Sequence, residues 1–219
     1  MPPVLTGRPP ARIMDIIDLV EEYAPGCTDL LMRAYIFTAK VHRGQSRISG
    51  EPYISHPLEV ARILAEMRQD PETVTAGLLH DTVEDTSATL DELQGLFGEQ
   101  VAALVNGVTK LARIDLPGTQ ALQAENYRKM LVAMAHDIRV IIIKLADRLH
   151  NALTLEYLPP KRRERIAQET AEIYAPLANR LGIGWLKGVL EDVAFKHLDV
   201  GAAHHREEMN GVLPGVRAL

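Results

Sequence analysis

PETVTAGLLHDTVEDT, residues 71–86, is the stretch that decides the expected fold. Asp70 in front of it and Pro71 at its start are typical of an N-cap and a first helical position, so a helix is predicted to begin here. Apolar side chains recur at three- and four-residue spacing elsewhere too, as in residues 13–20 and 34–41. No segment shows sustained strand alternation. The sequence therefore predicts an all-α protein of about ten helices.

The end of the same stretch, GLLHDTVEDT, gathers groups that bind metals or transfer protons. On a helix, Glu84 lies one turn beyond His80, and Asp85 lies one turn beyond Asp81. One imidazole and three carboxylates would then converge at a single helix end. A polar helix terminus with a half-buried histidine is the alternative, and the His-Asp pair alone does not exclude it.

Glycine and proline mark the predicted helix boundaries. Gly98 and Gly118 interrupt the helical pattern, and Pro159 with Pro160 restarts it. The run GIGWLKG, residues 182–188, lacks the GxGxxG spacing of dinucleotide-binding loops and follows no predicted strand, so it is interpreted as a helix boundary.

A polar loop is predicted at RGQSRISGEPYIS, residues 43–55. It is the longest segment before the C-terminus without a helical pattern. Loops of this kind either close a fold or line a pocket, and composition does not decide between the two.

Composition excludes several classes of protein. The 219 residues are 47% hydrophobic and 24% charged, as in ordinary globular proteins, and no apolar run is long enough to span a bilayer. We therefore expect a cytoplasmic protein without a membrane partner. The formal net charge of −5 argues against nucleic acid as the main partner. Cys27 is the single cysteine, so any metal must be held by histidine and carboxylates.

Two further segments could complete a metal site. His56 opens HPLEVARIL directly after the polar loop, and Asp147 follows the apolar run VIIIKLA, residues 140–146. That run predicts a core helix, in which a carboxylate is costly to bury unless it has a partner such as a cation. Individually, His56 could be a helix cap and Asp147 could pair with an arginine. Together with the His-Asp pair they form a mixed nitrogen and oxygen set that suits manganese or iron better than structural zinc.

Several long motifs in the chain resemble a known family. They are HRGQSRISGEPYISHP, GLLHDTVEDT, NGVTKL, AENYRKMLVAMAHDIRVIIIKLADRLHNALTL and ETAEIYAPLANRLGIGWLKGVLED. In this order they are similar to the hydrolase half of the RelA/SpoT family of (p)ppGpp enzymes, within the HD phosphohydrolase superfamily. The resemblance runs from about residue 30 to about residue 198 and implies an HD-domain helical bundle.

The resemblance implies one manganese ion and a pair of acidic residues beside it. The implied metal ligands are His56, His80, Asp81 and Asp147. It also implies that Glu84 and Asp85 act on the attacking water or on the leaving group, without deciding which residue does which. A divalent ion lowers the pKa of bound water from ~15.7 to as little as ~7, so this assignment is chemically reasonable.

The resemblance also implies a nucleotide pocket. Arg47 in the polar loop would stack on a guanine ring, and Tyr53 would support the loop. The remaining implied nucleotide contacts are Ser49, Asn151 and Thr154. This chain has Leu153 where the family commonly has arginine, so any contact of that arginine is in doubt.

Three cationic side chains are candidates for contacts with the diphosphate. Lys144, Arg148 and Arg43 could each meet its negative charge, and each could equally be a surface or ion-pair residue.

Because the acidic pair that the resemblance implies is present as Glu84 and Asp85, we expect an active hydrolase that converts ppGpp or pppGpp to GDP or GTP plus diphosphate in the stringent response.

The expected organisation is simple. Residues 1–11 should form a flexible tail, residues 12–198 the hydrolase domain, and residues 199–219 a C-terminal helix or tail with no synthetase domain. If the chain is a fragment of a long enzyme, a synthetase domain is expected downstream.

Two alternative functions remain open from the sequence. One keeps the metal site but hydrolyses another nucleotide, such as a dNTP or NADPH. The other is a non-catalytic sensor that binds guanine nucleotide or a partner protein and transmits the event through the helices.

Overall fold

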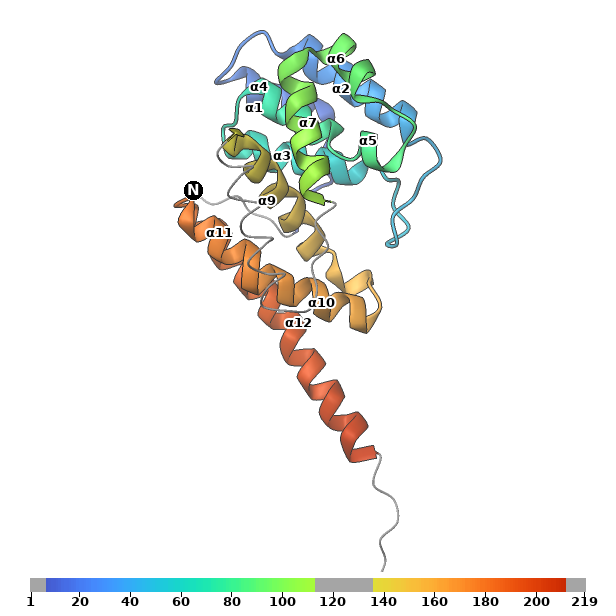
Figure 1. Ribbon diagram of the computed structural model, residues 1–219, viewed down its shortest axis with the longest axis vertical. Coiled ribbons are helices and arrows are strands. Elements are labelled where there is room, and N and C mark those ends of the chain that lie inside the picture. The colour runs from blue at the N-terminus through green and yellow to red at the C-terminus, as the bar shows by residue number, and fades with distance from the viewer. Residues whose placement is uncertain (1–6, 113–135, 212–219) are drawn as a thin grey trace, which may run out of the picture. The chain divides into compact units, whose positions relative to one another are not determined.

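The computed structural model describes residues 7–112 and 136–211, which belong to two compact units, Met1–His150 and Asn151–Leu219 (Figure 1). The regular elements in these described ranges are helical, and extended pairing there is limited to an isolated bridge between Ser46 and Pro52. The predicted all-α fold is confirmed over this part of the chain. None of the described helices is long and apolar enough to cross a membrane.

The helices that lie wholly or mainly in the first unit include the one predicted to begin at Pro71. In chain order they are α1 (Ile13–Glu21), α2 (Thr28–Val41), α3 (Ser55–Glu66), α4 (Pro71–Leu79), α5 (Thr82–Asp85), α6 (Leu90–Phe97), α7 (Glu99–Ala112) and α9 (Ile138–Leu153). Gly98 separates α6 from α7, as the sequence predicts, whereas the predicted interruption at Gly118 lies outside the described residues.

Helix α4 is the centre of the first unit, since α2, α3 and α7 all pack against it. Val74 and Leu78 of α4 are fully buried, in keeping with the apolar character of the stretch that predicted the fold. Gly77 allows α3 to approach closely, because a Cβ there would lie 2.4 Å from Leu64 Cδ1. Gly107 plays the same part between α7 and α9, where a Cβ would lie 2.6 Å from a methyl group of Val140.

The two ends of α4 are formed by polar residues, Asp70 and His80, whereas its interior is buried and mainly apolar. Asp70 is the N-cap, and its carboxylate accepts hydrogen bonds from the Thr73 amide at 3.0 Å and the Thr73 hydroxyl at 2.7 Å. The helix ends at Leu79, with His80 as its C-cap, and Asp81 is the N-cap of the separate short helix α5. The prediction of one helix running through the His-Asp pair is therefore wrong, because two helices meet at that pair.

Arg139 ties the beginning of α4 to the beginning of α9. Its guanidinium lies 3.3 Å from the Asp70 carboxylate and 2.6 Å from the carboxylate of Asp137, which directly precedes α9. The starts of the two helices are thus held by one side chain.

Glu21, the last residue of α1, caps the next helix. Its carboxylate accepts hydrogen bonds from the Gly26 amide at 2.8 Å, the Thr28 amide at 2.9 Å and the Thr28 hydroxyl at 2.7 Å. These bonds satisfy donors at the start of α2 and lower the pKa of Glu21 to about 2.

Two residues of the predicted tail, residues 1–11, contact helix α3. Arg8 forms an ion pair with Glu66 of α3 at 2.6 Å, and the Ala11 amide donates to Glu59 of the same helix at 3.0 Å. Ala11 is also buried. Pattern analysis of the sequence missed this attachment because isolated ion pairs leave no periodic signal.

The second unit is a set of packed helices with one local irregularity. Its elements are the 3₁₀ helix η1 (Leu155–Tyr157), α10 (Pro160–Glu169), the π-helical turn η2 (Thr170–Tyr174), α11 (Ala175–Arg180) and α12 (Gly184–Gly211). Pro160 begins α10, and Gly184 begins α12, as predicted. The wide turn η2 directly precedes the segment that holds Pro176, whose ring cannot continue an ordinary hydrogen-bonded helix. Helix α12 continues through the predicted boundary at residue 198.

Candidate metal centre

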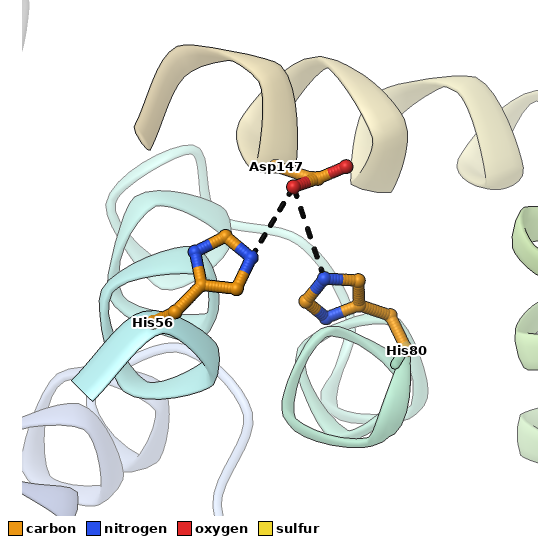
Figure 2. Close-up of side chains that lie close together, drawn as sticks. All are labelled: His56, His80 and Asp147. Carbon is orange, nitrogen blue, oxygen red and sulfur yellow. Dashed lines mark ion pairs between the residues drawn. The ribbon is translucent and has the colours of Figure 1, made fainter. Parts of the chain in front are cut away.

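His56, His80 and Asp147 come from three helices and lie together inside the first unit (Figure 2). His56 is in the first turn of α3, His80 caps α4, and Asp147 lies in α9. One ligand atom from each residue lies within 4.8 Å of the others, and all three residues are buried. Asp147 Oδ1 is 3.2 Å from His56 Nε2 and 3.9 Å from His80 Nε2. Such a group could hold a metal ion.

Asp81 borders this cluster through both of its carboxylate oxygens. Its Oδ1 lies 3.0 Å from His80 Nε2, and its Oδ2 lies 3.6 Å from His56 Nε2. The four side chains that the sequence proposes as ligands are therefore neighbours, with Asp81 at the more exposed edge. Residues separated by as many as 91 positions along the chain are brought together by the packing of α3 and α9 around the end of α4.

The chemistry of the donors fits a cation. His80 Nδ1 lies 2.8 Å from the Gly77 carbonyl oxygen, so this nitrogen carries a proton and Nε2 faces the carboxylates. That Nε2 is buried and has no hydrogen-bond partner among the described residues, because the contact with Asp81 lacks hydrogen-bond direction. A buried nitrogen without a partner is costly, and a positive ion at this point would supply one.

The electrostatics of the cluster also favour a positive charge. Burial lowers the pKa of His80, yet the carboxylates of Asp81 and Asp147 outweigh it and raise that pKa to about 9. Burial opposes the charged form of Asp147 as well, but Lys144 and the two histidines hold the pKa of its carboxyl well below the usual range. Burial dominates at His56 and lowers its pKa. The position between the carboxylates therefore attracts a proton or a cation.

Tyr53 connects the polar loop to the acidic residues. Its hydroxyl lies 2.7 Å from Asp81 Oδ2 and 2.6 Å from Asp85 Oδ2, and its ring stacks on His42 with centroids 4.4 Å apart. Burial and the two carboxylates raise the pKa of Tyr53, so the hydroxyl keeps its proton and donates it. The sequence suggested only that Tyr53 supports the loop.

The proposed acid and base differ in environment. Asp85 shares the Tyr53 hydroxyl, whereas Glu84 is exposed and its pKa is raised by partial burial of the carboxyl and by the charge of Asp81. Both belong to the short helix α5, which starts at the His-Asp pair. The break between α4 and α5 therefore determines where these two side chains lie.

The residues predicted to contact the diphosphate or the nucleotide lie in the polar loop, in α9 and directly after α9. Lys144 Nζ forms an ion pair with Asp147 Oδ2 at 2.7 Å, which is the alternative that the sequence left open for it. Ser49 has a buried hydroxyl in the loop without a hydrogen-bond partner among the described residues, and Arg43 is exposed. Arg148 lies in α9 one residue after Asp147. Asn151 and Thr154 belong to the second unit, where the Thr154 hydroxyl donates to the Asn151 carbonyl at 3.2 Å.

His150 is a member of the site that sequence reasoning missed. Its Nδ1 lies 2.7 Å from His56 Nδ1 and 3.4 Å from an Nη1 of Arg47. Burial, His56 and Arg47 lower the pKa of His150 to about 2, so its ring is neutral. A signal was present, because residues three apart on a helix share a face and His150 follows Asp147 by three.

Comparison with known proteins gives a consistent picture. Residues 34–184 match the model of a family described as "HD domain". The chain is 55% identical over 183 residues to a protein of Myxococcus xanthus named GTP pyrophosphokinase, covering 82% of this chain and 24% of that protein. It is 53% identical over 181 residues to the bifunctional (p)ppGpp synthase/hydrolase SpoT of Escherichia coli strain K12, covering 82% and 26% respectively.

A third relative is named for one reaction alone. The chain is 52% identical over 179 residues to a probable guanosine-3′,5′-bis(diphosphate) 3′-pyrophosphohydrolase of Synechocystis sp., covering 82% of this chain and 23% of that protein. The chain thus spans about a quarter of the length of these relatives.

Proposed function

The chain belongs to the HD domain family, and on that premise we propose that it hydrolyses the 3′-diphosphate of guanosine alarmones, converting ppGpp or pppGpp to GDP or GTP plus diphosphate. The observation that carries the proposal is the buried group of His56, His80 and Asp147 with Asp81 beside it. The matched quarter of the relatives supports it, since two of them are named for (p)ppGpp or 3′-diphosphate hydrolysis.

The proposed cofactor is one divalent manganese ion held by His56, His80, Asp81 and Asp147. Two imidazoles and two carboxylates, with no sulfur, suit manganese better than a structural zinc site. A bound divalent ion supplies a water of lowered pKa and neutralises charge on phosphoryl oxygens.

The roles proposed for the acidic pair follow from their surroundings. Glu84, whose raised pKa favours the protonated form, is suited to give a proton to the departing nucleotide oxygen. Asp85, held by the Tyr53 hydroxyl, is suited to orient the attacking water. The sequence alone did not decide which of the two residues has which role.

The substrate contacts are proposed from the polar loop and α9. Arg47 would stack on the guanine, and Ser49 would use its buried hydroxyl, which has no hydrogen-bond partner among the described residues. Lys144 and Arg148 would meet the diphosphate, and the family resemblance proposes Asn151 and Thr154 as further nucleotide contacts. Residues 12–198 are proposed as the domain that performs this reaction.

Diphosphate release from ppGpp by the purified chain tests the substrate, the reaction and the metal together. We expect turnover with manganese, none after chelation, and recovery when manganese is returned. His80→Ala should abolish turnover, whereas the matched control His136→Ala, at an exposed histidine, should leave it unchanged.

A panel of ppGpp, dNTPs and NADPH separates the proposal from the other enzymatic reading. Faster turnover of a dNTP or NADPH than of ppGpp would contradict the proposal that the alarmone is the substrate. Binding of guanine nucleotide with no turnover under any metal would favour the sensor and overturn the proposed reaction.

A further inference from the structure

His150 contacts two residues that belong to different parts of the proposed site. Its Nδ1 lies 2.7 Å from Nδ1 of His56, which is 94 positions away in the sequence, and 3.4 Å from a guanidinium nitrogen of Arg47, which is 103 positions away. His56 reaches the metal centre with its other nitrogen, whose distance to Asp147 Oδ1 is 3.2 Å. Arg47, His150 and His56 therefore form a chain of contacts from the polar loop to the candidate metal centre.

The donors and acceptors along this chain of contacts are constrained by Arg47. A guanidinium has only donors, so the His150 nitrogen that faces it must be an acceptor without a proton. The same nitrogen faces His56 Nδ1, and a hydrogen bond between two nitrogens needs one proton. That proton must then belong to His56 Nδ1.

This arrangement has a consequence at the opposite edge of the His56 ring. A neutral imidazole with its proton on Nδ1 presents a lone pair on Nε2. That is the form in which a histidine binds a metal through Nε2, and the partner of the second nitrogen is what fixes it.

Asp147 pulls the His56 ring toward the other tautomer. Its Oδ1, at 3.2 Å from His56 Nε2, would accept a proton from that nitrogen. His56 is thus placed between a carboxylate that favours the proton on Nε2 and the His150–Arg47 pair that favours it on Nδ1.

We propose that His150 is a positioning residue that, held as an acceptor by Arg47, keeps the proton of His56 on Nδ1 and so prepares Nε2 to bind a cation. The inference rests on the metal centre of the proposed function. It links the loop arginine to metal binding through the contact of Arg47 with His150.

Arg47 gives a test in which two physical effects have opposite signs. A positive charge near a cation site weakens cation binding, so Coulomb repulsion alone predicts tighter manganese binding in Arg47→Met. The proposed chain of hydrogen bonds predicts weaker binding, because His56 is released toward the tautomer with its proton on Nε2.

The first measurement is manganese affinity of the whole chain, by titration calorimetry, for four variants and a control. Loss of a residue that orients a metal-binding histidine typically weakens affinity about 10- to 100-fold, and we expect this for His150→Phe and Arg47→Met. His150→Asn places an amide oxygen near the position of Nδ1, and Arg47→Lys keeps a charged donor, so both should recover part of the loss. The control His136→Ala should bind as the unmodified chain does.

The second measurement reads the tautomer directly, in ¹⁵N-histidine-labelled, metal-free protein by NMR. We expect the His56 proton on Nδ1 in the unmodified chain and on Nε2 in Arg47→Met. Melting temperatures by circular dichroism identify any variant that fails to fold, and the tautomer of the unmodified chain decides the inference in that case.

The outcomes separate this inference from the proposed function. A His56 proton on Nε2 in the unmodified chain, or tighter manganese binding in Arg47→Met, would overturn the positioning role. A chain that binds manganese with the expected tautomer but does not hydrolyse ppGpp would leave His150 in its role and remove the proposed reaction.

Discussion

Single side chains set the electrostatics of the candidate site, and Tyr53 is the one that joins two carboxylates. Without its hydroxyl, Asp81 and Asp85 would lose the donor that lies 2.7 and 2.6 Å from them. Two like charges would then face each other with nothing between them. The tyrosine therefore holds an acidic residue of the short helix α5 beside the candidate metal centre.

Tyr53→Phe tests this role. Hydrogen bonds to charged groups contribute about 1.5–3 kcal/mol, so we expect the turnover of ppGpp to fall about 10- to 100-fold. Steady-state kinetics should show the change mainly in kcat, because the ring and its stacking on His42 remain. Tyr157→Phe, at an exposed tyrosine, is the control. An unchanged kcat in Tyr53→Phe would contradict the role.

Helices are joined in this fold by side chains at their ends, and Glu21 gives the clearest case. Its carboxylate at the end of α1 accepts the donors at the start of α2. The folded-state pKa of about 2 lies below the ordinary 4.5. The stabilisation is therefore complete above the ordinary value and is lost as the pH falls toward the folded-state value.

Glu21→Gln should consequently lower the melting temperature near neutral pH, with a smaller effect in acid. Melting curves of the unmodified chain and the variant at about pH 7 and about pH 3 would measure the two gaps. Glu22→Gln is a control one residue away. If the gap were the same at both values of pH, the carboxylate charge would not be the source of the stabilisation.

Close helix contacts lead to a second prediction at this scale. Gly107→Ala should destabilise the fold by about 1–3 kcal/mol, because the added methyl group would meet the stiff side chain of Val140. Gly95→Ala, on the open side of α6, should instead stabilise by about 0.5–1 kcal/mol through its higher helix propensity. Chemical denaturation of both variants measures the difference, and equal effects would remove the packing argument.

At the scale of the whole molecule, the proposed metal ligands connect distant parts of the first unit. His56, His80 and Asp147 belong to three helices that separate on unfolding, and an ion held by all three binds only the folded form. Manganese should therefore raise the melting temperature. The added stability grows with the logarithm of the metal's excess over its dissociation constant and reaches about 2.7 kcal/mol at a hundredfold excess. The same titration in His80→Ala should show little shift. A shift of equal size in both proteins would place the ion elsewhere.

Much of this molecule was predictable from its sequence, for identifiable reasons. The cap at Asp70 and the helical period of α1 and α2 depend on neighbours within a few residues, and these features were predicted. The end of α4 was not, since the run through His80 and Thr82 is compatible with a continuing helix. Whether a helix continues there depends on packing by distant segments.

The candidate site divides in the same way. Residue types and the family resemblance selected four proposed ligands, and the structure brings these side chains together. The pairing of Lys144 with Asp147 and the contact of His150 with His56 depend on how helices face each other, so the sequence left the first open and missed the second. The division into two compact units at residues 150 and 151 has no counterpart in the sequence pattern, and the domain bounds 12–198 stay a prediction.

The ion pairs of Arg139 with Asp70 and Asp137 have a consequence for insertions and deletions. The Arg139 side chain contacts the residues directly before α4 and α9. The positions of His80 and Asp147 relative to this contact are therefore determined by the number of helical residues in between. Removing a single residue from the interior of α4 would draw His80 back by about 1.5 Å and rotate it by about 100°. Related chains should therefore vary in length within the connecting segments and keep the spans 71–80 and 138–147 at constant length.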